Sequence, residues 1–327
     1  SADRPNYKID IGDGQTIQQN NVFGDHVIGF ENLFQDVNHS TNSILESNLQ
    51  RIIPDSFKTT ELLDLQKKTQ RDNERILLDL FIKTLHNSKP VHLNVPFEEP
   101  LSEFSDQPTI TISNETKYPI KKDDLTVFNS PLIKDYKKIM ILFGCANKGI
   151  LSESTIDKLS SCDNIVVLKE TTSNLNNTSF FGKIDQLIAP AELNENSSEL
   201  FNKLKPELLI TVGGMIISKK IKSMLRTYEP TAHIHLGHND AKDTFYKGVE
   251  HFKIDPNLFF KKSLEKLVSN YNYKKPWIDI SKKRALAHKK YLNKLPFSDL
   301  KVFSMLESRI PKKYTIQVSN SSTIRYM

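Results

Sequence analysis

The hydrophobic positions in the middle of the chain predict a parallel β-sheet whose strands alternate with helices. Three short continuous apolar runs, residues 138–144, 164–168 and 207–212, are typical of strands that are buried on both faces. A fourth run, 232–236, interleaves two histidines with apolar residues. Helical spacing between the runs predicts helices at residues 152–160, 181–187, 198–204 and 218–226. This alternation predicts an α/β unit that ends near residue 270.

The segments on either side carry weaker patterns. Apolar residues recur at helical spacing across 72–86, which predicts a helix, and residues 91–95 alternate as in a strand. Beyond the central unit, residues 277–293 and 297–308 each predict a helix. The run at 312–318 predicts one further strand.

These patterns divide the chain into four parts. At 327 residues the chain is longer than most single domains, and residues 101–134 combine few apolar positions with several prolines, as a connecting segment does. We predict a first unit at 1–104, a linker at 105–134, a central unit at 135–270 and a third unit at 271–327. Because the predicted strand at 312–318 leads into a polar cluster that the chain does not continue, we expect an internal piece of a larger enzyme.

Composition and charge narrow the class of function. The net charge is +6 and the pI about 9.0, yet lysines interleave with acidic residues along most of the chain and no nucleic-acid-binding module is recognisable. We therefore expect no nucleic-acid partner. No apolar run approaches the roughly 18 residues of a spanning helix, so we expect no membrane span. Cys145 and Cys162 lack a metal-ligand spacing, which favours reduced thiols and a cytoplasmic location.

Two glycine motifs resemble ligand sites but each lacks a required part. Gly12-Asp13-Gly14, with Asn38 further on, resembles the magnesium-diphosphate signature of thiamine-diphosphate enzymes, but no buried strand long enough to aim the aspartate precedes it. Residues 144–149 resemble a phosphate loop, but their lysine precedes the glycine instead of following it. We interpret both as ordinary turns.

Four polar residues near the fourth predicted strand could hold a metal ion. His233 and His235 share one face of that strand, and His238 and Asp240 follow it. Such residues more often line the end of a strand or meet solvent, so we predict no metal site.

Basic residues beside predicted helix starts are candidates for binding anions. Lys219 and Lys220 begin the helix after Gly213-Gly214, where ammonium and backbone N–H groups favour a carboxylate or phosphate. A solvated first turn explains the two lysines equally well. Arg325 follows a strand-to-loop segment and can bind a carboxylate through two parallel hydrogen bonds.

Three segments in one order carry a resemblance to a known family. They are residues 2–23, which contain Ala-Asp-Arg-Pro and Gly-x-x-Gln-Thr-Ile-x-Gln; residues 90–101, which contain His-Leu-Asn-Val-Pro-Phe-x-Glu-Pro-Leu; and residues 319–325 with Ser-Asn-Ser and an arginine. Together they resemble the 2-succinyl-5-enolpyruvyl-6-hydroxy-3-cyclohexene-1-carboxylate synthase family of menaquinone biosynthesis, which depends on thiamine diphosphate. The 90–101 segment is the most specific of the three.

The resemblance implies an α/β fold with a parallel-sheet, Rossmann-like central domain between incomplete parts of two thiamine-diphosphate-binding-fold domains. Residues 1–104 match the C-terminal part of the pyrimidine-binding domain, 135–270 the central domain, and 271–327 the start of the pyrophosphate-binding domain. The family is a transferase that decarboxylates 2-oxoglutarate on thiamine diphosphate and magnesium and adds the succinyl carbanion to isochorismate. It places its cofactor between subunits, so a homo-oligomer is implied.

The resemblance also assigns roles to polar residues, since both substrates are dicarboxylates and their site needs fixed cations. The residues that match substrate contacts are Arg4, Gln15, Lys219, Lys220 and Arg325, and the residue that matches a cofactor contact is Ser321. No catalytic residue and no metal ligand is assigned within this sequence.

The chain departs from the family pattern in three ways. Gly14 stands where the family commonly has asparagine, and Lys220 replaces an arginine and so lacks its planar fork of donors. The family's glutamate that activates the aminopyrimidine precedes residue 1, and its magnesium site follows residue 327. We therefore expect the chain alone to bind neither thiamine diphosphate nor magnesium tightly, and to be inactive.

Two other functions stay open. The chain could belong to a different thiamine-diphosphate carboligase of the acetolactate-synthase type, although the 90–101 segment argues against it. Alternatively, the strand ends of residues 135–270 could form a non-catalytic site for a nucleotide or metabolite.

Overall fold

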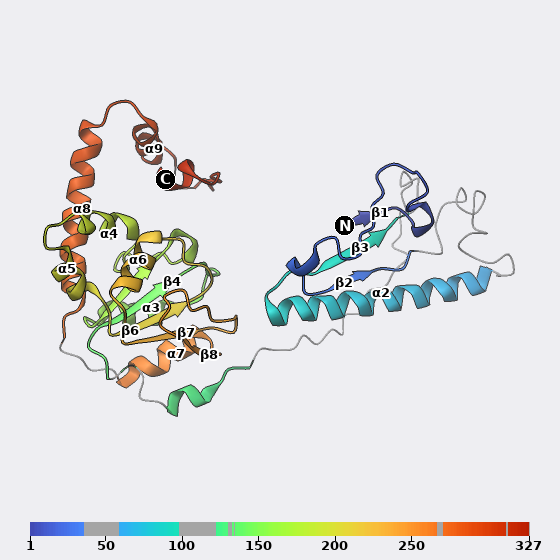
Figure 1. The fold of residues 1–327 in the computed structure, drawn as a ribbon, viewed down its shortest axis with the longest axis horizontal. Helices are drawn as coiled ribbons and strands as arrows, with labels where there is room; N and C mark the ends of the chain where they lie inside the picture. The colour runs from blue at the N-terminus through green and yellow to red at the C-terminus, as the bar shows by residue number, and fades with distance from the viewer. Residues whose placement is uncertain are drawn as a thin grey trace. The chain divides into compact units, whose positions relative to one another are not determined.

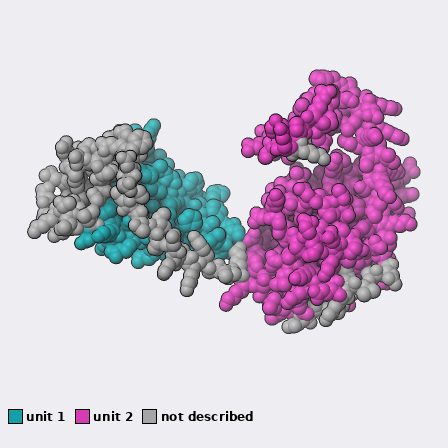
Figure 2. Space-filling view, turned by 180° about the vertical axis from the view of Figure 1, so that it is seen from behind, with its two compact units in different colours: residues 1–121 teal, residues 122–327 magenta. Residues whose placement is uncertain are grey.

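The computed structural model describes residues 1–35, 59–97, 122–129, 133, 135–266, 271–311 and 313–326. The chain forms two compact units, Ser1–Lys121 and Lys122–Met327, which we call unit 1 and unit 2 (Figures 1 and 2). Asn38 and most of the predicted linker at 105–134 lie outside the described residues. The predicted domain boundaries therefore stay predictions.

Unit 2 is built on a five-stranded parallel sheet with the strand order β5-β4-β6-β7-β8. The strands are β4 (Ile139–Phe143), β5 (Ile165–Lys169), β6 (Leu208–Val212), β7 (Ala232–Leu236) and β8 (Glu250–Phe252). Every residue of β4 and β6 is buried, because both faces of the sheet are covered. The four predicted strands are confirmed to within one or two residues, and so is the α/β fold class with a parallel sheet.

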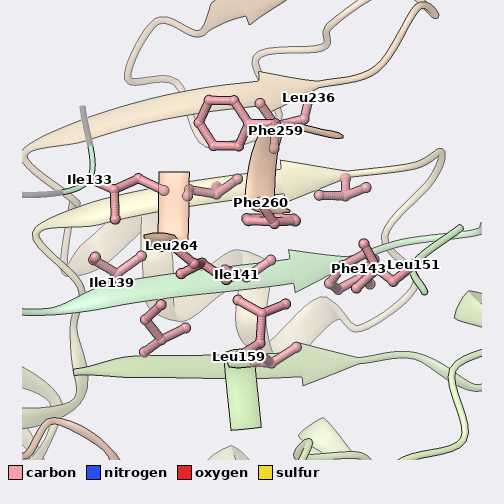
Figure 3. Packing of buried hydrophobic residues seen from close by; sticks show 14 of the residues in the cluster. Ile133, Ile139, Ile141, Phe143, Leu151, Leu159, Leu236, Phe259, Phe260 and Leu264 are labelled. Atoms are coloured by element: carbon pink, nitrogen blue, oxygen red, sulfur yellow. The ribbon is translucent and has the colours of Figure 1, made fainter. Parts of the chain in front are cut away.

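Alternate residues of each strand enter two separate cores. Ile139, Ile141 and Phe143 pack with one set of helices, whereas Met140 and Leu142 pack with another on the opposite face. The first core is covered by a 3-10 helix (Leu125–Asn129), α3 (Glu153–Ser161) and α7 (Pro256–Ser263), and Figure 3 shows part of it. The second is covered by α4 (Ile184–Glu192), α5 (Ser197–Leu204), α6 (Lys219–Thr227) and the start of α8 (Lys274–Lys294).

Polar caps start several of these helices at the positions where the strands end. The hydroxyl of Ser152 accepts a hydrogen bond from Thr155 N at the start of α3, and the carboxylate of Asp255 accepts one from Leu258 N at the start of α7. Ser218 caps α6 in the same way, through Ile221 N at 3.1 Å. The caps fix where each helix leaves its loop, and so fix the residues that the loops present.

Three elements of unit 2 differ from the sequence-based expectations. The helix predicted at 181–187 begins later, as α4, because Phe181 instead forms a parallel bridge with Leu168 at the edge of β5. β8 and α7 were not predicted, because β8 has three residues of which only Phe252 is buried, too short a pattern to recognise.

The C-terminal part of unit 2 is helical. α9 (Asp299–Glu307) follows α8, and the short α10 (Ser322–Tyr326) packs on α9. The strand predicted at 312–318 is wrong: residues 313–318 form no strand, and all but Val318 among them are exposed. A β-pattern forms a strand only where another strand offers its backbone groups, and none does so here among the described residues.

Unit 1 contains a three-stranded parallel sheet in the order β1-β3-β2. Its elements are β1 (Ala2–Asp3), 3-10 helices at Asn6–Lys8 and Gly24–His26, β2 (Phe30–Asn32), α2 (Thr59–Asn87) and β3 (His92–Pro96). The predicted helix and strand are confirmed, the helix with an extra N-terminal part. β1 and β2 are too short to be read from a pattern. In the described residues no helix has the length and apolar character needed to span a bilayer.

Candidate functional site

The central strand of unit 1 holds its two neighbours through one buried amide. Asn94 is 3% exposed, and its Nδ2 donates to Asp3 Oδ2 at 2.9 Å and to Asn32 Oδ1 at 3.0 Å. These bonds link β3 to both β1 and β2. The most distinctive sequence segment, 90–101, therefore contains a residue that organises the sheet.

His92 has a similar structural position. It is 5% exposed and lies between two aromatic rings, with centroid distances of 4.8 Å to Phe23 and 4.9 Å to Phe30. Burial is the main cause that lowers the pKa of His92. A neutral imidazole packed in this way supports the loop that contains Phe23 against the strand.

The structure brings together the two site residues predicted in unit 1. Arg4 directly follows β1, and its Nη2 donates to Gln15 Oε1 at 3.4 Å. The backbone N–H of Arg4 donates to Asp3 Oδ1 at 2.9 Å, which fixes the chain as it leaves the strand. Gln15 has a φ of 61°, in the left-handed region, so its loop turns sharply towards the arginine. A guanidinium and an amide thus lie side by side at the carboxyl end of a parallel strand.

In unit 2 two carboxylates of the chain occupy the start of α6. Glu170 Oε1 accepts from Ile217 N at 2.9 Å and from Ser218 N at 2.8 Å. The hydroxyl of Ser218 donates to Asp185 Oδ1. Glu170 thereby satisfies the N–H groups of residues 217 and 218, and both carboxylates complement the positive end of the helix dipole. The anion site predicted at this helix start therefore stays a prediction, with two backbone donors just before Lys219 already paired with Glu170.

The two lysines of α6 differ in their surroundings. Lys220 forms an ion pair with Glu192 from the end of α4. Lys219 is exposed and has no ion-pair partner among the described residues. Exposed apolar side chains precede it in the loop after β6, with Met215 73% and Ile217 48% exposed. The loop after β6 and the first residue of α6 therefore present exposed apolar side chains followed by an ammonium group with no ion-pair partner among the described residues.

The glycines after β4 and β6 bring two loops into direct backbone contact. Gly214 N donates to Cys145 O at 2.6 Å, and Cys145 N donates to Met215 O at 3.1 Å. A Cβ on Gly144 would lie 2.3 Å from Gly214 O, so a side chain does not fit. The strand order reverses between β4 and β6, and parallel sheets commonly bind ligands beyond the carboxyl ends of the two strands at such a point. The backbone fills that position, which explains the glycines without a bound phosphate.

The candidate metal residues are engaged in other contacts. Thr211 Oγ1 lies 3.0 Å from both His233 Nε2 and His235 Nδ1, and His238 Nε2 lies 3.0 Å from Asp123 Oδ1. Burial lowers the pKa of His233 and of His235 to about 4. In the part of the chain that the structure describes, no group of three histidine, cysteine or acidic residues has metal-binding geometry.

The last two predicted residues lie at and just before α10. Ser321 precedes the helix with a φ of 71°, and its N–H donates to Asn320 Oδ1 at 2.6 Å. Arg325 lies one turn later and is exposed. A ring contact between Phe303 and Tyr326, with centroids 5.9 Å apart, attaches α10 to α9. Ser321 therefore lies at the turn before this short helix and Arg325 lies within it, while their proposed ligands stay predictions.

Sequence reasoning missed Glu170 and Asp185. Glu170 directly follows β5, and polar residues at the carboxyl end of a parallel strand are candidates for a site. That signal was available in the sequence. Asp185 lies inside α4, and only the tertiary structure shows that it reaches Ser218.

Comparison with known proteins identifies close relatives in sequence. No family model matches the chain. The chain is 39% identical over 338 residues to the 2-succinyl-5-enolpyruvyl-6-hydroxy-3-cyclohexene-1-carboxylate synthase of Flavobacterium johnsoniae, 36% over 336 residues to that of Flavobacterium psychrophilum, and 37% over 334 residues to that of Christiangramia forsetii. Each match includes the whole of this chain and 53%, 53% and 55% of the relative. The chain thus spans about half the length of these relatives.

Among solved structures, benzoylformate decarboxylase from Polynucleobacter necessarius matches 69% of this chain and 40% of its own, with a TM-score of 0.35 and 13% identity. A likeness at that level supports no conclusion about this chain. The sequence relatives do, and they confirm the resemblance found in the three segments: along its whole length, the chain is homologous to the 2-succinyl-5-enolpyruvyl-6-hydroxy-3-cyclohexene-1-carboxylate synthases.

Proposed function

We propose that the chain provides substrate-binding cations to a thiamine-diphosphate-dependent synthase that decarboxylates 2-oxoglutarate and adds the resulting four-carbon unit to isochorismate. The whole-length similarity to three synthases of that name supports the reaction class. The observation that carries the assignment to residues is Lys219, which is exposed and uncompensated beside apolar side chains. A cyclic dicarboxylate needs both an ammonium for its charge and an apolar surface for its ring.

The other predicted residues fit the same chemistry. Arg4 with Gln15 offers guanidinium and amide groups at one strand end, and Arg325 offers a second planar donor fork. Lys220 fits this role less well than its neighbour, because its ammonium group already pairs with Glu192. We infer that Lys219 contacts substrate and that Lys220 supports the fold of the loop.

Thiamine diphosphate, when bound, supplies the electron sink for the decarboxylation. The described residues fit only a minor share of its binding. Ser321 offers a hydroxyl beside the backbone turn that starts α10, but no described acidic cluster is arranged to hold the magnesium ion that a diphosphate requires. The role of this chain is accordingly to bind and orient the dicarboxylates. The cytoplasmic location, predicted from the two cysteines, and the homo-oligomeric assembly, implied by the resemblance, stay predictions.

Two carboxylates position the substrate-binding lysine in this proposal. Glu170 and Asp185 hold the residues immediately before Lys219 through three hydrogen bonds. Because these bonds fix the loop from residue 217 to the start of α6, Lys219 leaves the helix in a defined direction. Rigid support of this kind is what a site for an oriented substrate needs.

The alternative functions gain no support from the geometry. A nucleotide or metabolite site at the central strand ends would need space between the loops after β4 and β6, which are in backbone contact. The choice of substrate distinguishes the proposed synthase from an acetolactate-type enzyme. The complete polypeptide that contains this sequence should convert isochorismate and 2-oxoglutarate, and it should not use pyruvate.

The test of the residue assignment is Lys219→Ala in that complete polypeptide. Loss of a charge-assisted hydrogen bond of about 1.5–3 kcal/mol should lower kcat/KM for isochorismate by roughly ten- to a hundredfold. The matched control is Lys158→Ala, an exposed lysine on α3, which should leave kcat/KM unchanged. Equal activity of the Lys219→Ala variant and the unmodified enzyme would refute the role of Lys219, while absence of the reaction in the unmodified enzyme would refute the proposed function.

A further inference from the structure

The positive charge of the chain is concentrated on one helix. α8 (Lys274–Lys294) contains eight of the 45 lysines and arginines and one of the 39 acidic residues, a net charge of +7. The rest of the chain has 37 basic and 38 acidic residues, a net charge of −1. The net charge of +6 is therefore a property of α8, which the interleaving of charges elsewhere had hidden.

Four of these lysines lie on one exposed face of the helix. They form two adjacent pairs, Lys282 with Lys283 and Lys289 with Lys290. The second pair lies seven residues after the first, and Leu286 lies between the two pairs. At 100° per residue all five side chains lie on the side opposite Trp277, which is 1% exposed in the second core. All five are exposed, Leu286 to 65%. We call these five residues the α8 stripe.

The charge of the α8 stripe is not compensated within the described residues. None of its four lysines forms an ion pair with a residue that the structure describes, although Asp279 lies within one turn of the first pair. The start of α8 is held by other contacts: Trp277 is buried, and Lys274 Nζ donates to Ser160 O at 2.7 Å. The fold does not need the stripe, and Figure 1 shows the second half of α8 standing clear of the sheet of unit 2.

The shape of this surface favours a flat anionic partner. A straight helix face places the two lysine pairs about 10 Å apart along one line. Leu286 lies between them and is 65% exposed. Phospholipid headgroups offer negative charge together with an apolar layer just beneath it, so they satisfy both kinds of side chain. A nucleic-acid duplex offers charge but gives an exposed leucine nothing to bury against.

We propose that the α8 stripe binds the surface of an anionic phospholipid bilayer. The contact is peripheral and mainly electrostatic, because the stripe has one apolar side chain for four lysines. Each lysine near an anionic leaflet strengthens such binding by about fivefold, and the effect falls off within a Debye length. The proposal is independent of the synthase function.

The test is co-sedimentation of the chain with lipid vesicles. Vesicles of equal parts phosphatidylglycerol and phosphatidylcholine should bind the chain, and vesicles of phosphatidylcholine alone should not. Raising the salt to about 0.5 M should release the bound chain, since the Debye length falls to roughly 4 Å. Equal binding to both kinds of vesicle, or none to either, would overturn the proposal.

Variants then assign the binding to the α8 stripe. Reversing all four of its lysines to glutamate should lower the partition coefficient by at least about a hundredfold. The substitutions lie on an exposed face, and an unchanged circular dichroism spectrum and melting temperature will show that the fold is intact. A second variant, Leu286→Ser, should lower the partition coefficient by a few-fold only.

A control variant separates the stripe from overall charge. It carries Lys148→Glu, Lys158→Glu, Lys242→Glu and Lys261→Glu, four exposed lysines of unit 2 that lie outside α8. Its net charge equals that of the stripe variant, so its partition coefficient should fall by no more than about threefold. An equal fall in both variants would refute a local site. Stripe-dependent retention on duplex DNA without vesicle binding would instead identify a nucleic-acid surface and refute the proposal.

Discussion

The two sheets of this chain are stabilised in different ways. In unit 2, β4 and β6 are buried along their whole length, and apolar side chains fill both faces. In unit 1 the central strand β3 is only partly buried, and its two buried residues are the polar His92 and Asn94. Leu80 is the one hydrophobic residue of unit 1 that is buried among those the structure describes.

The difference indicates that the sheet of unit 2 is a stable scaffold, whereas the sheet of unit 1 places particular polar side chains. Hydrophobic burial is non-directional and strong, so it stabilises the sheet of unit 2 without placing any particular polar group. Hydrogen bonds are directional, so the amide of Asn94 fixes the spacing of three strand ends, at one of which Arg4 lies. Unit 1 should therefore be the more sensitive to loss of a polar contact and unit 2 to loss of volume.

The largest effect is expected from Phe143→Ala in β4. Phe143 is 0% exposed, so its loss removes buried apolar surface and leaves a cavity, at a cost of about 3–5 kcal/mol. Amide hydrogen exchange of β4 and β6, measured by mass spectrometry, should accelerate accordingly. This readout resolves the two units, which a single melting curve does not.

The matched substitution in unit 1 is Phe34→Ala. Phe34 is 58% exposed, so the free energy of unfolding should change by less than about 1 kcal/mol. If Phe34→Ala destabilised unit 1 as much as Phe143→Ala destabilises unit 2, the contrast between the two sheets would be wrong.

Acid should destabilise unit 2 through its buried histidines. The pKa of His233 and of His235 is about 4 in the folded chain because burial disfavours the charged form, whereas the unfolded chain takes up these protons near pH 6.5. The stability that the two neutral histidines allow is therefore fully present above pH 6.5, and it decreases as the pH falls towards 4. At pH 5 each histidine should cost about 2 kcal/mol relative to pH 7.

Denaturant titrations across this pH range measure the effect. His233→Leu removes one of the two titrating groups and should reduce the pH dependence of unfolding by about half. In unit 1 the lowered pKa of His92 has the same sign, with burial again the main cause. A pH dependence in the His233→Leu variant as steep as in the unmodified chain would show that other groups are responsible.

The smallest of the three effects is expected from Asn94→Ala in β3. The substitution leaves Asp3 and Asn32 without their shared donor, at a cost of about 1–3 kcal/mol. Hydrogen exchange should accelerate in β3 and its neighbours and stay unchanged in β4. The control is Asn6→Ala, an exposed residue with no side-chain hydrogen bond in the described structure, which should change stability by less than about 0.5 kcal/mol.

The strands of unit 2 were easier to predict from the sequence than those of unit 1, for the same reason. Residues 138–144 were recognisable because a strand buried on both faces must be apolar throughout. β1 and β2 were not, since two or three residues carry no period and their pairing depends on β3 from 60 residues or more further along the chain. The pattern at 312–318 failed for the opposite reason, because alternation alone supplies no partner strand.

The candidate site was predictable in part. Residue type and position near strand or helix ends identified Lys219, Lys220 and Arg325. Only the family resemblance identified Arg4, Gln15 and Ser321, and the structure places Arg4 against Gln15. The sequence did not distinguish Lys219 from Lys220, because the difference lies in Glu192, 28 residues away. Nor did it show that Glu170 and Asp185 would bind the residues that lead into α6.

The amino-acid sequence by itself determined the parallel α/β unit, the positions of four of its strands and of most of the helices between them, and the resemblance to the synthases. Each of these depends on short-range periodicity or on residue identity, which survive without coordinates. The tertiary structure alone decided which charges are neutralised, which loops close on one another and which lysines stay exposed. Those outcomes depend on side chains that are distant in sequence and adjacent in space, and electrostatic and steric effects act over a few ångströms.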